Sequence, residues 1–146
     1  HADVFLDRVE REFRRLAGDK EARRSAGLLL GQGRKLLVEA IASGRMPNTV
    51  LTSETEPDMP DGVSCIPVTE ELLAYISPMK SAPEVLFTVP IPEERGPVFG
   101  RVLLAEDMQD PGNVGTMIRT AAAFGFDGIL LAGLKETFCG LIQLFK

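Results

Sequence analysis

The segment that most constrains the fold is PIPEERGPVFG, residues 90–100, which holds three prolines and two glycines. Proline has no backbone N–H to give to a helix or a sheet, and glycine loses the most conformational freedom when it is ordered. This composition is typical of a boundary between domains and not of the interior of a helix or strand. The sequence therefore predicts a linker over residues 91–100, with one domain before it and the beginning of a second after it.

Before the linker, helical and strand patterns alternate. Apolar residues at helical spacing, from Phe5 to Leu16, predict a helix over residues 4–17, and Thr69 is a suitable N-cap for another helix. Between these two, a further helix should begin at Arg34. The whole order, β-α-β-β-α-β after the leading helix, predicts an α/β sandwich of roughly ninety residues. The strands are expected at 28–30, 50–52, 63–67 and 85–89. The inward-facing residues of the helix that begins at Arg34 are expected to be Leu36, Leu37, Ala40 and Ile41.

After the linker the pattern predicts one βαβ unit, with strands at 102–105 and 128–131 around a helix over 113–124. A parallel sheet is normally covered on both faces and has several strands. Only two strands are predicted, so the domain over 101–146 is expected to be incomplete. The last residues, LKETFCGLIQLFK, fit a frameshifted end, an engineered truncation or a short amphipathic helix with Phe138, Leu141, Ile142 and Phe145.

Charge and cysteine usage constrain the function only loosely. The net charge of −5 argues weakly against nucleic-acid binding, but residues 1–45 hold ten Lys/Arg against seven Asp/Glu. An RNA-binding surface is therefore expected first near the N-terminus. Cys65 and Cys139 have no zinc-type spacing, and we interpret both as reduced thiols. With no secretory leader and no long apolar run, the sequence predicts a cytoplasmic protein that does not enter a membrane.

The most informative segment is DPGNVGTMIRTAAAFG, residues 110–125, which follows a predicted strand. Loops at the carboxyl ends of strands carry the ligand sites of open α/β sheets. The turn that starts at Asp110 would let Asn113 cap the next helix, where Arg119 is the only positive charge among residues 102–134. Taken singly, Asn113 is more often a plain helix cap and Arg119 a surface arginine. Taken singly, Asp107 and Asp110 are more often solvated carboxylates.

Together these residues resemble the first signature of the SpoU/TrmH family of RNA 2′-O-methyltransferases, approximately D-P-x-N-x-G-x-x-x-R-T-A-x-x-F-G. Every fixed position is filled, from Asp110 to Gly125. The upstream segments LLLGQGRKLLVEAIASG and MKSAPEVLFTVPIP resemble the two ends of that family's substrate-binding domain. The resemblance implies a ribosomal-protein-like RNA-binding domain over 27–90, after a basic helical segment over 1–26. It also implies the beginning of a parallel-sheet α/β-knot domain of the SPOUT type over 101–146.

The resemblance further implies methyl transfer from S-adenosyl-L-methionine to a ribose 2′-hydroxyl of structured RNA, either ribosomal or transfer RNA, with ribosomal RNA favoured. Arg119 would contact the target phosphate and help to activate the hydroxyl, and Asn113 would orient the arginine. The basic residues expected to bind structured RNA are Arg23, Arg24, Arg34 and Lys35. Family members usually form homodimers through the catalytic domain, and no metal is implied.

The family's two later signatures, which bind the cofactor in a knot, do not follow Gly133. No residue of this chain is therefore assigned to the cofactor, and the knot is expected to be missing. A non-catalytic module that binds structured RNA is the alternative hypothesis. A generic nucleotide-binding enzyme is a third, but the sequence has no glycine-rich phosphate loop to support it.

Overall fold

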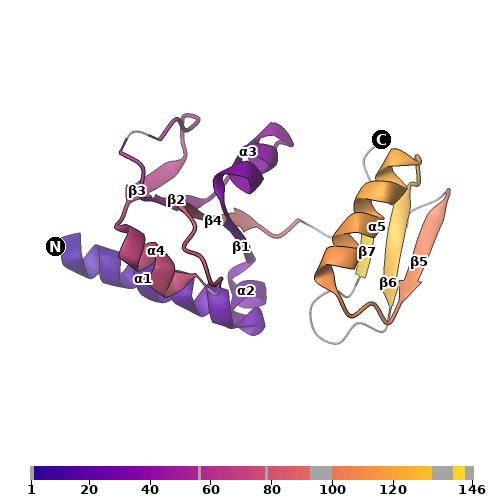
Figure 1. Ribbon diagram of the computed structural model, residues 1–146, viewed down its shortest axis with the longest axis horizontal. Helices are drawn as coiled ribbons and strands as arrows, with labels where there is room; N and C mark the ends of the chain where they lie inside the picture. The colour runs from indigo at the N-terminus through magenta and orange to yellow at the C-terminus, as the bar shows by residue number, and fades with distance from the viewer. Residues whose placement is uncertain (1, 56, 78, 93–99, 133–139, 144–146) are drawn as a thin grey trace. The chain divides into compact units, whose positions relative to one another are not determined.

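The computed structural model describes residues 2–55, 57–77, 79–92, 100–132 and 140–143. The chain divides into two compact units, His1–Pro92 and Glu93–Lys146, which are described separately (Figure 1). No helix among the described residues is both long and apolar enough to span a bilayer.

A mixed four-stranded sheet forms the centre of the first unit, in the order β1-β4-β2-β3 (Figure 1). β4 pairs antiparallel with both β1 and β2, whereas β2 and β3 are parallel. The strands are β1 (Leu28–Gln32), β2 (Thr49–Thr52), β3 (Ser64–Pro67) and β4 (Val85–Pro90). The helices are α1 (Ala2–Gly18), α2 (Lys20–Ala26), α3 (Arg34–Ala42) and α4 (Glu70–Ile76).

Helices cover both faces of this sheet, which makes the first unit an α/β sandwich. On one face, Phe13 of α1 and Leu73 of α4 pack against Leu51 and Leu86 of the strands. On the other face the core contains Leu37 of α3 with Val50, Val85 and Phe87. The expected alternation of helices and strands is thus confirmed. Leu36 does not face inward as expected, because it is 49% exposed while its neighbour Leu37 is buried.

One glycine of the predicted turn has a packing role instead. Gly31 lies within β1, and any Cβ at this position would overlap the ring of Phe87, which crosses from β4. Gly33 is the turn residue, with φ of 93° at the N-cap of α3. The two glycines of the GQG segment therefore have different roles. Gly31 makes room for a core ring, and Gly33 adopts the positive φ that the turn requires.

The second unit is a three-stranded sheet in the order β5-β6-β7 (Figure 1). β5 (Val102–Glu106) and β6 (Gly128–Ala132) are parallel, and α5 (Pro111–Ala123) connects them. β7 (Gly140–Gln143) pairs antiparallel with β6. The helix expected for the C-terminal segment is therefore wrong at residues 140–143, which supply backbone hydrogen bonds to the open edge of β6. Phe138 and Phe145 lie outside the described residues.

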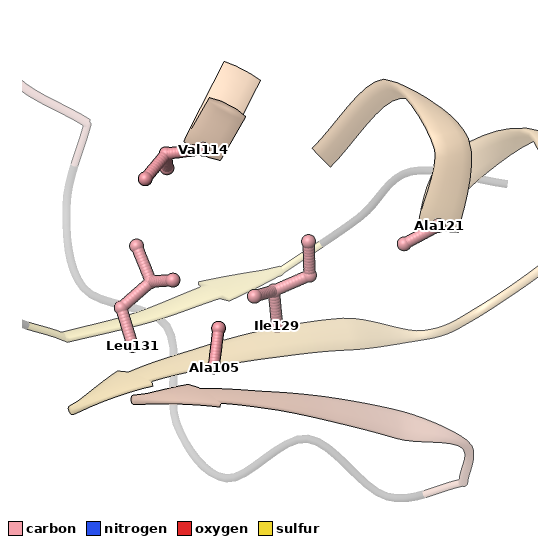
Figure 2. Close-up of a cluster of buried hydrophobic side chains, with 5 residues drawn as sticks. All are labelled: Ala105, Val114, Ala121, Ile129 and Leu131. Atoms are coloured by element: carbon pink, nitrogen blue, oxygen red, sulfur yellow. The ribbon is translucent and has the colours of Figure 1, made fainter. Parts of the chain in front are cut away.

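Among the described residues, side chains are packed on one face of this second sheet. Figure 2 shows Val114 and Ala121 of α5 pointing toward Ala105, Ile129 and Leu131 of the strands, and all five side chains are buried. Three apolar side chains that point to the opposite face are exposed. These are Val102 at 38%, Leu104 at 62% and Leu130 at 41%.

Candidate functional site

The start of α5 is capped by Asp110. Its carboxylate accepts a hydrogen bond from the Gly112 N–H at 2.9 Å, and its carbonyl accepts from the Val114 N–H at 3.2 Å. Pro111 occupies the first turn, where its missing N–H leaves no backbone bond unmade. The interpretation of Asn113 as the cap is therefore wrong, because Asn113 already lies inside the first turn of the helix.

Arg119 lies on the exposed side of α5. Its Nη2 donates a hydrogen bond to the Thr116 hydroxyl at 3.3 Å, and that hydroxyl donates to the Gly112 carbonyl at 3.0 Å. A Cβ on Gly115 would lie 3.4 Å from Nη1 of Arg119, so the arginine folds back along the glycine face of the helix. Among the described residues, no carboxylate forms an ion pair with Arg119. Most of its N–H donors therefore remain available to an anion.

Asn113 and Arg119 are not joined. They are six positions apart, so at about 100° per residue their side chains point about 120° apart around the helix. Asn113 is exposed and makes no side-chain hydrogen bond within the described part of the chain. The structure thus places both residues on α5 but gives no direct contact through which Asn113 could orient the arginine.

The loop between β5 and α5 also contains an unusual backbone conformation. Asp107 has φ of 54°, a left-handed value that few residues other than glycine adopt. Its N–H donates to the Ala132 carbonyl at 3.0 Å, which ties the loop to the end of β6. Glu106 and Asp107 are exposed at this edge, and they do not enclose a ligand. No group of three His, Cys, Asp or Glu residues suited to a metal ion occurs in the described ranges.

The four basic residues predicted to bind RNA do not form one cluster. Arg23 and Arg24 lie on α2, before β1, whereas Arg34 and Lys35 begin α3, after it. A five-residue strand spans about 16 Å, so the two pairs lie at opposite ends of β1.

Three of these four side chains already have partners. Arg23 donates to the Leu16 carbonyl at 2.7 Å, and Arg24 forms an exposed ion pair with Glu21 at 3.5 Å. Arg34 holds Glu54 with two N–H groups, one of them Nε at 3.0 Å. This hydrogen bonding and the opposite charge keep the pKa of Glu54 below its ordinary value and raise that of Arg34. Lys35 is exposed.

Sequence reasoning missed a second group of polar residues on the first unit. A hollow of about 380 Å³ is lined by Asp7, Glu10, Arg11, Arg14 and Tyr75. Asp7 and Glu10 also line a neighbouring hollow of about 580 Å³ with Leu6, Pro67, Val68, Thr69 and Leu72. No local pattern marks this group, because α1 and α4 contribute residues far apart in the sequence and packing brings them together.

Comparison with known proteins gives consistent relatives. No protein-family model matches the chain. A 23S rRNA (guanosine(2553)-2′-O)-methyltransferase from Bacillus subtilis is 32% identical over 125 residues, which are 83% of this chain and 50% of that protein. An uncharacterised tRNA/rRNA methyltransferase from Synechocystis is 34% identical over 123 residues, covering 76% and 45%. An AdoMet-bound rRNA methyltransferase from Sinorhizobium meliloti has a TM-score of 0.69 at 25% identity, covering 88% and 52%.

These relatives are named as RNA methyltransferases, and the chain is similar to proteins of that class over most of its own length. More narrowly, the chain is a homologue of the SpoU/TrmH family of RNA 2′-O-methyltransferases. It spans about half the length of the curated relatives that it matches.

Proposed function

We propose that this chain acts in the 2′-O-ribose methylation of RNA, with ribosomal RNA as the substrate and S-adenosyl-L-methionine as the methyl donor. The observation that carries the proposal is Arg119, an exposed guanidinium on α5 with no carboxylate partner among the described residues. The relative from Bacillus subtilis, which is named as a 23S rRNA 2′-O-methyltransferase, supports the substrate class.

In this proposal Arg119 binds the phosphate next to the target ribose. A guanidinium stays protonated at any ordinary pH, so it is a poor general base but a good partner for a phosphate oxygen. Holding the phosphate fixes the adjacent 2′-hydroxyl, and positioning of a weak nucleophile lowers the barrier to transfer. The Thr116 hydroxyl and the glycine face of α5 keep the guanidinium close to the helix. Asn113, which is exposed six residues earlier on α5, is proposed to organise the catalytic loop.

The described residues do not fit the cofactor by themselves. The carboxyl ends of β5 and β6 present exposed carboxylates, Glu106 and Asp107, and not an enclosed site for a nucleoside. We therefore assign no residue to S-adenosylmethionine and derive no step through it. The AdoMet-bound rRNA methyltransferase from Sinorhizobium meliloti supports this methyl donor for the family.

Residues 27–90 are proposed to form the RNA-binding domain, with the basic segment 1–26 before it, the linker 91–100 after it and the catalytic domain from 101 onward. Arg23, Arg24, Arg34 and Lys35 are the proposed phosphate contacts, at two ends of β1. A homodimer through the second unit is part of the proposal. The exposed apolar side chains of that unit, among them Leu104 and Leu130, are compatible with such contact.

A non-catalytic RNA-binding module is the second candidate. The observation in its favour is that the first unit has a buried core on each face of its own sheet. Such a unit can bind RNA without any catalytic domain.

The test is methyl transfer from tritiated S-adenosylmethionine to ribosomal RNA transcripts, with the whole chain as the enzyme. A 2′-O-methyl group blocks alkaline cleavage of the next bond, so label in alkali-resistant dinucleotides identifies the ribose oxygen as the acceptor. We expect Arg119→Ala to reduce this label by about 100-fold, the size typical of losing one charge-stabilising donor. Arg101→Lys is the matched control, because Arg101 instead contacts the Gly125 carbonyl and the Phe126 ring.

Three outcomes separate the candidates. Methyl transfer that depends on Arg119 and not on Arg101 supports the proposal that the chain acts as an RNA methyltransferase. Salt-dependent RNA binding without transfer by the wild-type chain favours the module. Transfer that is unchanged in Arg119→Ala contradicts the assigned role of that residue.

A further inference from the structure

The hollow between α1 and α4 has a composition that phosphate contacts alone do not explain. These two helices pack side by side on one face of the first sheet (Figure 1). The hollow of about 380 Å³ is lined by two arginines, two carboxylates and one tyrosine. Its size falls in the range of small-molecule sites, roughly 300–1,000 Å³. Its lining includes none of the residues assigned above to phosphate binding.

Arg14 and Tyr75 form a stacked pair at this hollow. The Arg14 guanidinium lies 3.8 Å from the centre of the Tyr75 ring, well inside the distance of a cation–π contact. Tyr75 is nevertheless 56% exposed, so the pair stands at the surface and is not part of the core. A planar guanidinium already stacked on an aromatic ring is a rigid platform on which another flat ring can stack.

The charged neighbours of this platform are not paired with one another. Glu10 precedes Arg14 by four residues and Asp7 precedes Arg11 by four, which is the spacing at which helical ion pairs form. Among the described residues, neither pair makes an ion pair or a side-chain hydrogen bond. Both carboxylates therefore keep acceptor oxygens at the hollow, and Arg11 keeps its donors.

We propose that this hollow binds an unpaired guanine base of the RNA. A phosphate would be repelled by Asp7 and Glu10, whereas a base can stack on the Arg14–Tyr75 pair without bringing charge into the hollow. Guanine is the base whose Watson–Crick edge offers two adjacent N–H donors, N1–H and N2–H, and a carboxylate accepts such a pair with both oxygens. Arg11 then contacts the phosphate of the flanking nucleotide.

This inference rests on the proposed function, since it assumes an RNA substrate. It adds a base-specific contact on the first unit, at residues that were not among the expected RNA-binding positions. Recognition of single-stranded bases commonly combines aromatic or guanidinium stacking with hydrogen bonds to base edges. The site would thus select an RNA loop by the identity of one of its unpaired bases.

The experiment uses the whole chain and three labelled RNA hairpins with the same stem. The loop is all uridine, uridine with one guanosine, or uridine with one inosine, which lacks only the N2 amino group. Binding is followed by fluorescence anisotropy at low salt. We expect the guanosine hairpin to bind about 10-fold more tightly than the uridine hairpin, and inosine to lose much of this preference. A tenfold preference corresponds to about 1.4 kcal/mol, which lies within the range of one stacked base, about 1–3 kcal/mol.

Two kinds of variant assign the preference to this hollow. Tyr75→Ala should abolish it, whereas Tyr75→Phe, which keeps the ring, should retain it. Glu10→Gln should reduce the difference between guanosine and inosine and leave the uridine hairpin bound. Because Tyr75 and Glu10 are not in the buried core, these variants are expected to fold, and a thermal melt of each one checks this.

Failure of this inference is distinct from failure of the proposed function. Equal binding of all three hairpins, unchanged by Tyr75→Ala, overturns the guanine site and leaves RNA binding intact. No binding of any hairpin at low salt overturns both.

Discussion

The two units of this chain bury their sheets to different extents. In the first, helices cover both faces, and separate clusters that include Leu51 and Val50 lie on either side of the same strands. In the second, α5 covers one face, while Leu104 and Leu130 on the other face remain 62% and 41% exposed. Val50 and Leu51 of the first unit are thus buried strand residues, whereas Leu104 and Leu130 of the second unit are exposed.

Because of this difference, the effects of a substitution on stability and on function are easier to tell apart in the first unit than in the second. The first unit has the packing of an independent scaffold, and its polar groups can change without loss of the fold. In the second unit the residues that resemble the methyltransferase signature lie on the one helix that also supplies the core, through Val114 and Ala121. Substitutions in α5 therefore have to be sorted into those that unfold the unit and those that remove a functional group.

The largest effect should come from the core of the first unit. Phe87 is 1% exposed and packs over Gly31 of the neighbouring strand. We expect Phe87→Ala to lower the free energy of unfolding of this unit by about 3–5 kcal/mol, because it removes buried area and leaves a cavity. Urea denaturation followed by amide hydrogen exchange reports each unit separately.

The matched substitution in the second unit is Leu104→Ala, also an apolar strand residue but exposed. Here we expect a change within about 0.5 kcal/mol, as for most surface sites. A loss comparable to that of Phe87→Ala would show that the open face of the second sheet is covered in solution. The comparison between the two units would then no longer hold.

A smaller effect tests the start of α5. Asp110→Ala should destabilise the second unit by about 1 kcal/mol, because its carboxylate caps the Gly112 N–H. Asn113→Ala should leave stability within about 0.5 kcal/mol, since Asn113 makes no side-chain hydrogen bond among the described residues. Thermal unfolding of the two variants measures both. A larger loss of stability for Asn113→Ala than for Asp110→Ala would identify Asn113 as the cap of α5 and contradict the structure.

Local patterns predicted the elements well, because their residues are neighbours in sequence. The strand expected at 85–89 is Val85–Pro90, and Thr69 caps α4 by accepting from the Leu72 N–H. The helix cap of α5 was predicted wrongly because Asp110 and Asn113 are both good caps. Pro111 decides between them, since proline favours the position directly after the cap.

Side-chain pairs between distant elements were not predictable in the same way. Arg34 and Glu54 are 20 residues apart, and nothing local to either residue indicates the other. Arg14 and Tyr75 meet only because α1 and α4 pack on the same face of the sheet. Basic residues could be counted from the sequence, but which of them remain free for RNA depends on tertiary structure.

The smallest predicted effect contrasts two of the arginines proposed to bind phosphate, one from each unit. Arg34 in the first unit is held by Glu54, whereas Arg119 in the second has no carboxylate partner within the described ranges. Because hydrogen bonding to Arg34 lowers the pKa of Glu54, this carboxylate stabilises the folded state above its unfolded pKa, about 4.3. The contribution is lost as the pH falls through the lower pKa of the folded state.

We therefore expect the melting temperature of Glu54→Gln to lie slightly below that of the wild type at pH 6–7 and to converge with it below about pH 4, where the carboxylate of the wild type becomes protonated. Glu39→Gln is the control, because it removes an exposed carboxylate of α3 that forms no ion pair among the described residues. Arg119→Gln should leave the pH dependence of stability unchanged. Equal pH dependence in the wild type and Glu54→Gln would mean that Arg34 is as free in solution as Arg119, and that both are available to RNA without breaking an ion pair.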